Sequence, residues 1–290
     1  MTRLGAARWD GPVAYADGCP LLTVDPGDRV PGRSSPRPFA HPVRTLGGTV
    51  VTDVAPRDHR HHLGVSMAVP DLAGTNHWGG RTHVRGAGST LLPNHGRQRT
   101  TDVAIDGATR RERVEWCDEH ARLQAVEDRA LTASPAPGDR GWVLEWRSVV
   151  EPVRELSIGS PATNGREGAF YGGWFWRTGF DGARTTVRVG TGSADRRTGG
   201  AHGSASPWLL VASTSAHLLA VQHGVPRPWF VRSSGYVGFG PALAVGERLR
   251  IAPAAPLVQD VSVLVGDGPA PRGEELEQLA ARLVEGGNVR

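Results

Sequence analysis

The stretch WVLEWRSVV (residues 142–150) alternates between apolar and polar side chains along most of its length. Trp142, Leu144 and Trp146 fall on one face of an extended chain, and the residues between them fall on the other face. A period of two over this length is typical of a β-strand with one buried face. This stretch therefore predicts a strand at the core of a sheet.

Short apolar segments bounded by Gly, Pro, Asp or Asn recur along the chain, and each reads as a further strand. They are Arg44–Thr52, Gly64–Val69, Arg113–Cys117, Arg122–Leu131, Thr185–Val189, Trp208–Ala212, His217–His223, Trp229–Arg232 and Arg248–Ile251. The 39 glycines and 22 prolines suit many strands joined by tight turns, and residues 134–139 form a hairpin loop in this interpretation. We expect an all-β protein in which two large, mostly antiparallel sheets carry residues 44–251 as a β-sandwich.

One segment has helical rather than strand periodicity. Between Gly273 and Glu285 the apolar residues recur every three or four positions, with two glutamates in the first turn and Gly286 just beyond. This pattern predicts a single amphipathic C-terminal helix packed on the outside of the sheets. We find no interdomain linker and no internal repeat, so residues 1–290 are expected to form one domain.

The net charge of +4 and the isoelectric point near 9.8 do not indicate a nucleic-acid-binding protein. The sequence contains no lysine, so all 33 basic residues are arginines, and they are scattered among acidic residues instead of forming a stripe. The absence of lysine excludes Schiff-base catalysis. Cys19 and Cys117 lie far apart and do not indicate a disulfide scaffold. Without an apolar leader or a membrane-spanning run, we expect a cytoplasmic protein.

The candidate catalytic residues form a histidine cluster, in which His59, His61 and His62 follow Asp58. Histidine suits proton transfer near neutral pH and is also the commonest metal ligand. In an extended segment His59 and His61 would share one face, which is a good geometry for binding a metal if a further ligand comes from elsewhere. The alternative is a polar loop whose histidines only cap backbone groups.

Two later segments supply candidate substrate-binding residues. The Gly-rich aromatic stretch NGREGAFYGGWFWR (residues 164–177) combines tandem glycines with rings and guanidinium groups, which suits a sugar or aromatic ligand. A core strand is the alternative, and it is the better interpretation for Trp174 and Trp176. The Pro-rich loop at residues 223–232 could present further binding groups. The predicted binding residues are His95, Arg166, Tyr171, Arg177, His223 and Arg227.

Several segments together resemble one bacterial family, DUF6807, whose members are often labelled "methane oxygenase PmoA". The segments are PVRT (42–45), TD (52–53), DHRHHLG (58–64), NHWG (76–79), NGR (164–166), YGG (171–173) and RPW (227–229). The resemblance covers about residues 36–260, and the histidine block is its most specific part. It implies a galactose-mutarotase-like β-supersandwich from a family often met among sugar-catabolism genes. In such folds, histidines and a carboxylate in the concave face act as acid and base on a sugar ring.

These observations predict an enzyme that acts on a carbohydrate or sugar-derived metabolite by histidine-based general acid/base chemistry. His59 and His62 are the candidate proton-transfer groups, and His61 is a third such group or an orienting residue. No cofactor is expected in this interpretation, and the partner is a small sugar-like substrate. One alternative is a soluble oxygenase with a divalent transition metal on His59 and His61, and another is a non-catalytic sugar-binding module. The sequence leaves the substrate, the reaction type and the oligomeric state open.

Overall fold

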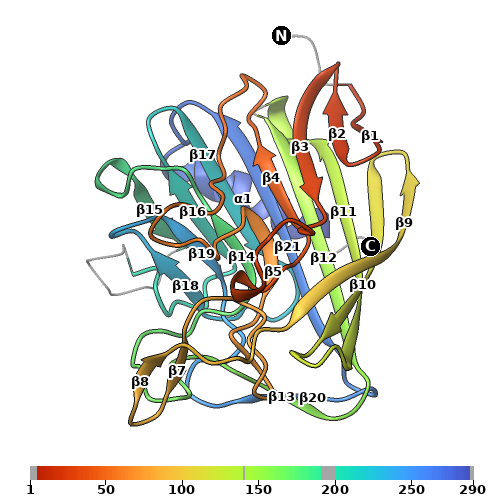
Figure 1. Ribbon diagram of the computed structural model, residues 1–290. Coiled ribbons are helices and arrows are strands. Elements are labelled where there is room, and N and C mark those ends of the chain that lie inside the picture. The colour runs from red at the N-terminus through yellow and green to blue at the C-terminus, as the bar shows by residue number, and fades with distance from the viewer. Residues whose placement is uncertain (1–4, 140, 191–199, 288–290) are drawn as a thin grey trace.

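Two eight-stranded antiparallel sheets face each other in the computed structural model, which describes residues 5–139, 141–190 and 200–287 (Figure 1). The first sheet has the order β1 (Arg8–Asp10), β2 (Val13–Ala16), β3 (Cys19–Asp25), β4 (Phe39–Val43), β5 (Val65–Ala68), β14 (Gly173–Arg177), β19 (Gly238–Pro241) and β18 (Trp229–Arg232). The second has the order β15 (Thr186–Val189), β16 (Trp208–Ala212), β17 (Ala216–Gln222), β21 (Leu257–Asp267), β12 (Trp142–Pro152), β11 (Leu123–Pro135), β10 (Thr109–Cys117) and β9 (Arg97–Asp106). The predicted all-β, two-sheet sandwich is therefore confirmed.

Smaller elements lie around this sandwich. A three-stranded sheet has the order β20 (Leu249–Ile251), β13 (Leu156–Gly159) and β6 (Asp71–Leu72), and β7 (Thr82–Val84) pairs with β8 (Gly88–Thr90) as a hairpin. Short 3-10 turns occupy Gly32–Ser34, Pro137–Asp139 and Gly182–Arg184. In Figure 1 the β7–β8 hairpin and the β13–β20 pair lie together at the lower end of the sandwich. The hairpin matters for function because it borders the cleft described below.

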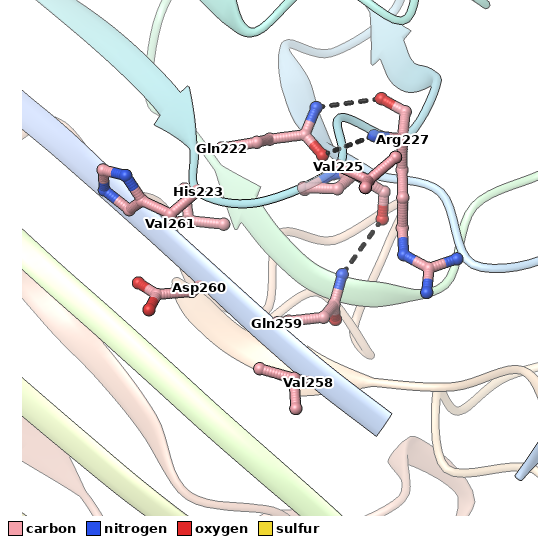
Figure 2. Close-up of a pocket in the computed structure, with 9 residues that line it drawn as sticks. Gln222, His223, Val225, Arg227, Val258, Gln259, Asp260 and Val261 are labelled. Atoms are coloured by element: carbon pink, nitrogen blue, oxygen red, sulfur yellow. Dashed lines mark hydrogen bonds between the residues drawn. The ribbon is translucent and has the colours of Figure 1, made fainter. Parts of the chain in front are cut away.

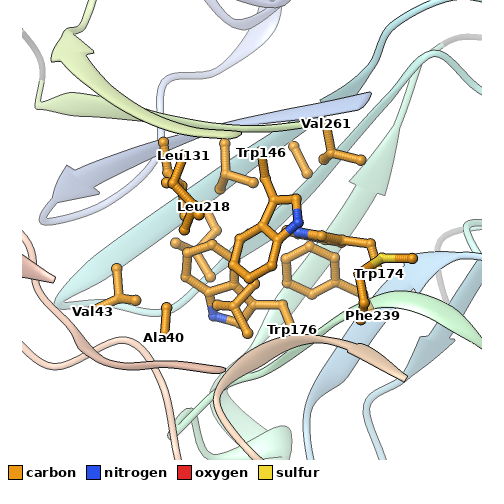
Figure 3. Close-up of a cluster of buried hydrophobic side chains, with 14 of the residues drawn as sticks. Ala40, Val43, Leu131, Trp146, Trp174, Trp176, Leu218, Phe239 and Val261 are labelled. Atoms are coloured by element: carbon orange, nitrogen blue, oxygen red, sulfur yellow. The ribbon is translucent and has the colours of Figure 1, made fainter. Parts of the chain in front are cut away.

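The core between the sheets is rich in tryptophan. Trp142, Leu144 and Trp146 of β12 are almost fully buried, as the alternation of residues 142–150 predicts. From the opposite sheet, β14 contributes Trp174 and Trp176 to the same cluster, next to Phe239 of β19. Figure 3 shows these rings packed together with aliphatic side chains from both sheets. The core-strand interpretation of Trp174 and Trp176 is therefore correct, and these two residues position β14 rather than bind a ligand.

The core also contains a buried ionic network on β10 and β11. Arg129 donates from Nε to Glu127 Oε1 at 2.8 Å, lies 3.5 Å from Glu112 Oε2 and stacks over the Trp146 ring at 4.9 Å. Arg110 pairs with the other oxygen of Glu112 at 2.8 Å. Buried charges are tolerated when each is paired and hydrogen-bonded. The network therefore allows charged residues on strand faces that the sequence pattern assigns to the core.

The C-terminal helix α1 (Gly273–Gly287) covers the outer face of the second sheet and extends two residues beyond the predicted range. Leu276, Leu279 and Leu283 pack on Leu219 of β17 and Leu264 of β21 within one apolar cluster. In Figure 1 the helix lies behind the strands of this sheet. Over the described ranges, no helix has both the length and the apolar character that crossing a bilayer requires.

The predicted strand boundaries are wrong in two places. Arg44–Thr52 is not a strand: β4 ends at Val43, and the chain then turns at Gly48, which has a φ of +88°. The side chain of Thr45 accepts a hydrogen bond from the Thr49 amide at 3.0 Å and holds this turn. The sheets also extend beyond residues 44–251, because β1–β4 and the central strand β21 lie outside that range.

The packing of α1 leads to a stability prediction. We expect Leu279→Ala to lower the free energy of unfolding by about 2–5 kcal/mol, because Leu279 is buried between the helix and the sheet. Denaturant unfolding followed by circular dichroism measures this change. Leu91→Ala, at a side chain 44% exposed, is the matched control and should change stability by about 0.5 kcal/mol or less. An equal effect of the two substitutions would contradict the packing described for α1.

Candidate active site

A cleft of about 610 Å³ brings together segments that are far apart in the sequence. Its walls come from the histidine turn at residues 58–62, the segment 78–81 with Ser89 of the β7–β8 hairpin, the loop 166–171, and residues 230–236 in β18 and the turn that follows it. The structure therefore places the histidine block and the Tyr171 block in one cleft. Among the predicted site residues, those that line it are His59, His61, His62, Arg166 and Tyr171.

The histidine segment is a pair of turns and not the extended strand that the His59/His61 pairing assumed. The amide of His59 donates to the carbonyl of Pro56 at 3.0 Å, and the amide of His62 donates to the carbonyl of His59 at 2.9 Å. Because the chain turns, all three imidazole rings gather on one side. Their centroids are 4.6 Å apart for His59 and His62, 4.8 Å for His61 and His62, and 5.8 Å for His59 and His61.

Asp58 and His59 form a carboxylate–imidazole pair on the wall of the cleft. The Nδ1 atom of His59 lies 2.8 Å from Asp58 Oδ2, and this hydrogen bond lowers the pKa of Asp58. An ionised carboxylate only accepts hydrogen bonds, so Nδ1 carries the proton and Nε2 of the neutral ring is left as a base. The His59 side chain is 33% exposed, which leaves it accessible from the cleft. This arrangement suits a general base.

His61 and His62 are kept neutral by their surroundings. Burial, together with the smaller effect of the nearby charge of Arg37, lowers the pKa of His61 to about 4. Burial likewise lowers the pKa of His62 far below its ordinary value, and His62 packs edge-on against Trp78 and Phe175. Nδ1 of His62 is buried without a hydrogen-bond partner. At neutral pH these two rings can therefore offer N–H donors but carry no charge.

The buried side chain of Arg37 links the segments that form the cleft. Its guanidinium group is almost fully buried, at 1% exposure, and makes five hydrogen bonds with no acidic partner among the described residues. The acceptors are the main-chain oxygens of Ser34, Ser35, His61 and Trp78 and the hydroxyl of Ser66. Burial lowers the pKa of Arg37 to about 9, so the group remains charged at neutral pH. One side chain thus joins strand β5 to two walls of the cleft.

Gly79 and Gly80 allow the backbone to pass close to His61. They have φ values of +98° and +71°, which favour glycine. A Cβ atom on Gly79 would lie 2.7 Å from His61 Cβ, and one on Gly80 would lie 2.9 Å from His61 Nδ1. Asn76 fixes this turn by accepting the amides of Trp78 and Gly79 on Oδ1. The NHWG segment therefore has a packing role against the histidine turn.

Aromatic rings line the cleft next to the histidines. Tyr236 lies 4.8 Å from both His59 and His62, and Trp78 lies 4.6 Å from Tyr171, measured between ring centroids. Burial raises the pKa of Tyr236 to about 12 and also raises that of Tyr171, so both phenols stay protonated. Flat rings beside polar groups suit the binding of a sugar-like molecule.

Two predicted binding residues stand behind the cleft wall. His95 donates from Nε2 to the carbonyl of Gly80 at 2.7 Å and so supports the turn that contacts His61. Arg177 is buried, pairs with Asp53 at 3.1 Å and lies under the Tyr236 ring at 4.6 Å. Neither residue lines the cleft. Each instead supports a residue that does: His95 supports Gly80, and Arg177 supports Tyr236.

Two predicted binding residues, His223 and Arg227, do not line this cleft. They line a separate, small pocket of about 30 Å³ with Gln259 and Asp260, and Figure 2 shows their side chains pointing away from each other. His223 lies 2.7 Å from the Ser262 hydroxyl, while Gln222 holds the Arg227 backbone through two hydrogen bonds. The reason is topological, because residue 223 follows β17 in the second sheet.

The structure lacks the strand geometry that the metal-binding alternative assumed. Its premise was a His59/His61 pair on one strand face, but residues 56–62 form turns. Nowhere in residues 5–139, 141–190 or 200–287 are three or more His, Cys, Asp or Glu side chains grouped to hold a metal ion. The two cysteines are free thiols.

Sequence reasoning missed several residues of the cleft. Trp78, Arg81, Glu167, Phe230 and Tyr236 all line it. Trp78 stands in the conspicuous NHWG segment. Arg232, at the end of the segment 223–232 that could present binding groups, lines the cleft too. Tyr236 lies in an SSGY turn with no local signal that distinguishes it from a surface residue.

Comparisons with known proteins give a family match and a structural likeness. The model of a family described as "Family of unknown function (DUF6807)" matches residues 13–281. No curated protein matches the chain. Among solved structures, a galactose 1-epimerase from Lactobacillus acidophilus NCFM is similar with a TM-score of 0.42 and 9% sequence identity, over 92% of this chain and 100% of that one.

The lowered pKa of His61 leads to a prediction about acid stability. Its pKa is about 4 in the folded protein and about 6.5 when unfolded, so the unfolded chain binds more protons between these values. Stability should fall as the pH drops from 6.5 towards 4, by about 1.4 kcal/mol per pH unit for each such histidine. Denaturant unfolding at several pH values should give a shallower slope for His61→Gln. His120→Gln, at an exposed histidine, should keep the wild-type dependence of stability on pH. An unchanged pH dependence in His61→Gln would contradict a lowered pKa for His61.

The role of Arg37 leads to a second prediction. Arg37→Lys keeps the charge but cannot reach all five acceptors, so we expect the free energy of unfolding to fall by at least about 2–3 kcal/mol. Thermal and denaturant unfolding measure this loss. Arg282→Lys, on the exposed side of α1, is the control and should be neutral. Equal stability of the two variants would show that the buried network does not hold the cleft.

Proposed function

The chain belongs to the DUF6807 family, and we propose that it is an enzyme that performs general acid/base chemistry on a carbohydrate or sugar-derived metabolite. The observation that carries this proposal is the Asp58–His59 pair on the wall of a 610 Å³ cleft. A binding module would gain nothing from a carboxylate that fixes the proton of an adjacent imidazole. A base poised at a cleft of substrate size supports catalysis.

In the proposed reaction, Nε2 of His59 removes a proton from a hydroxyl group or an activated carbon of the substrate. The imidazolium that forms is stabilised by Asp58 through the 2.8 Å hydrogen bond. The same imidazolium then returns the proton to the substrate at a second position or on the other face. The step is therefore redox-neutral and needs no group beyond the substrate and His59.

The neutral histidines and phenols have a different role. A neutral imidazole can donate a hydrogen bond to an oxygen on which negative charge develops, and such donors stabilise transition states strongly in a partly buried site. His61, with its pKa near 4, and the protonated Tyr236 meet this condition next to His59. We assign them to orienting the substrate and stabilising the oxyanion, and we do not assign them proton removal.

The class of substrate is supported by the composition of the walls. Tyr171 and Tyr236 line the cleft and are only partly buried, so their rings suit the apolar side of a sugar ring. Donors on the histidines and arginines suit its hydroxyl groups. An apolar ligand would leave these donors without partners, which is costly. The cleft therefore favours a polyhydroxylated molecule.

The experiment that tests the proposal is proton exchange followed by NMR. Free monosaccharides and their acids are incubated with the protein in deuterium oxide, and the spectra report both faster anomer interconversion and deuterium entering at carbon. We expect one of these reactions to be catalysed. His59→Gln should then lower the rate by roughly 100- to 10,000-fold, because it removes the base.

Two further variants sharpen the test. Asp58→Asn should lower the rate by a smaller factor, roughly 10-fold or more, because it removes the acceptor that fixes the His59 tautomer. His120→Gln, at an exposed histidine away from the cleft, should leave the rate unchanged. Binding of sugars without any exchange or interconversion would favour a non-catalytic module and overturn the proposal.

A further inference from the structure

We propose that the substrate carries a negatively charged oxyanion group, a carboxylate or a phosphate, which the rim arginines Arg81, Arg166 and Arg232 bind. The inference rests on the proposed function only in taking the cleft beside His59 as the substrate site. It goes further by assigning the charge of the molecule that enters. The inference is drawn from guanidinium groups around the cleft that have no carboxylate partner.

The three arginines come from different segments and meet only in the fold. Arg81 precedes β7, Arg166 lies in the loop before β14, and Arg232 ends β18, yet all three line the same cleft. Arg232 lies 6.0 Å from the Tyr236 ring, and Arg166 and Arg232 are both close enough to this phenol to affect its ionisation. Two of the cations therefore stand near Tyr236, whose ring contacts the histidine turn.

None of the three forms an ion pair within the described part of the chain. Arg81 donates to the carbonyl of Ser89 at 3.3 Å and Arg232 to that of Ser234 at 3.1 Å, whereas the side chain of Arg166 makes no hydrogen bond to any residue that the structure describes. Elsewhere on the surface, arginines such as Arg99 and Arg248 are paired with carboxylates at 2.9 Å and 2.6 Å. The rim arginines are thus left free to bind an anion.

The balance of charge in the cleft is positive. The carboxylates that line it are those of Asp58 and Glu167, and Asp58 is already bonded to His59. Below the histidine turn, Arg37 adds a buried cation that has only neutral acceptors. His61 and His62 contribute no charge at neutral pH because burial lowers the pKa of each. A neutral sugar would leave this excess positive charge unmatched.

Guanidinium groups favour carboxylates and phosphates because their planar donors match the paired oxygens of these anions. One such charge-assisted interaction strengthens binding by roughly 10-fold or more. We therefore expect a charged sugar to bind at least about 10-fold more tightly than its neutral counterpart. The preference should weaken as salt rises, since the rim is exposed.

Calorimetric titration of the purified protein with three matched hexoses tests this inference. The probes are glucose, glucuronate and glucose 6-phosphate, which share a ring and differ in the acidic group. We expect glucuronate or glucose 6-phosphate to bind at least about 10-fold more tightly than glucose, and the tighter of the two identifies the acidic group. Binding of glucose as tight as that of both acids, or no measurable binding of either acid, would overturn the inference.

Variants identify the residues that bind the anion. Arg166→Gln and Arg232→Gln should each weaken binding of the charged probe by roughly 10-fold while changing glucose binding little. Arg282→Gln on α1 is the matched control and should leave both unchanged. A loss of the same size for charged and neutral probes would contradict binding of the acidic group by the arginines.

Repeating the titration with His59→Gln separates this inference from the proposed function. The variant lacks the base but keeps the rim arginines, so the charge preference should persist. A charge preference without any turnover by the wild-type protein would sink the catalytic proposal and leave the anion site standing. Turnover of neutral sugars with no charge preference would support the catalytic proposal and overturn the anion site.

Discussion

The cleft depends on one buried cation. Arg37 lies beneath the histidine turn and bonds to main-chain oxygens from the 3-10 turn at residues 32–34, from Ser35, from Trp78 and from His61. A buried charge without a counter-ion is costly unless its donors are satisfied, and here the neutral carbonyls satisfy them. Because these partners belong to separate walls, Arg37 ties the positions of the walls to one another.

The sandwich supplies the rigid base for this arrangement. Strand β5 starts three residues after His62 and pairs with β14, whose tryptophans are locked in the core between the two sheets. The cleft is built from the connections beyond these strands, and the β7–β8 hairpin closes one side. Loops on a rigid scaffold can hold chemical groups accurately without being buried themselves. In this protein the Trp core provides the rigidity and the turns provide the chemistry.

The sequence predicts those parts that depend on local pattern. The alternation of residues 142–150 and the helical spacing of residues 273–285 hold in the structure, and His59, His61, His62, Arg166 and Tyr171 do share one cleft. The parts that depend on long-range topology could not be predicted in this way. Arg37 lay in a Ser/Pro/Arg-rich segment with no periodic signal, Tyr236 lay in an ordinary turn, and the position of His223 depends on which sheet receives β17.

The acceptors that Arg37 uses have an evolutionary consequence. Four of its five hydrogen bonds end on backbone carbonyls, which every amino acid provides. Residues 34, 35, 61 and 78 could therefore change their side chains without removing the bonds that frame the cleft. The side chains that contact the ligand can therefore change during evolution while the backbone around the cleft keeps its shape. Relatives with the same arginine can then differ in chemistry.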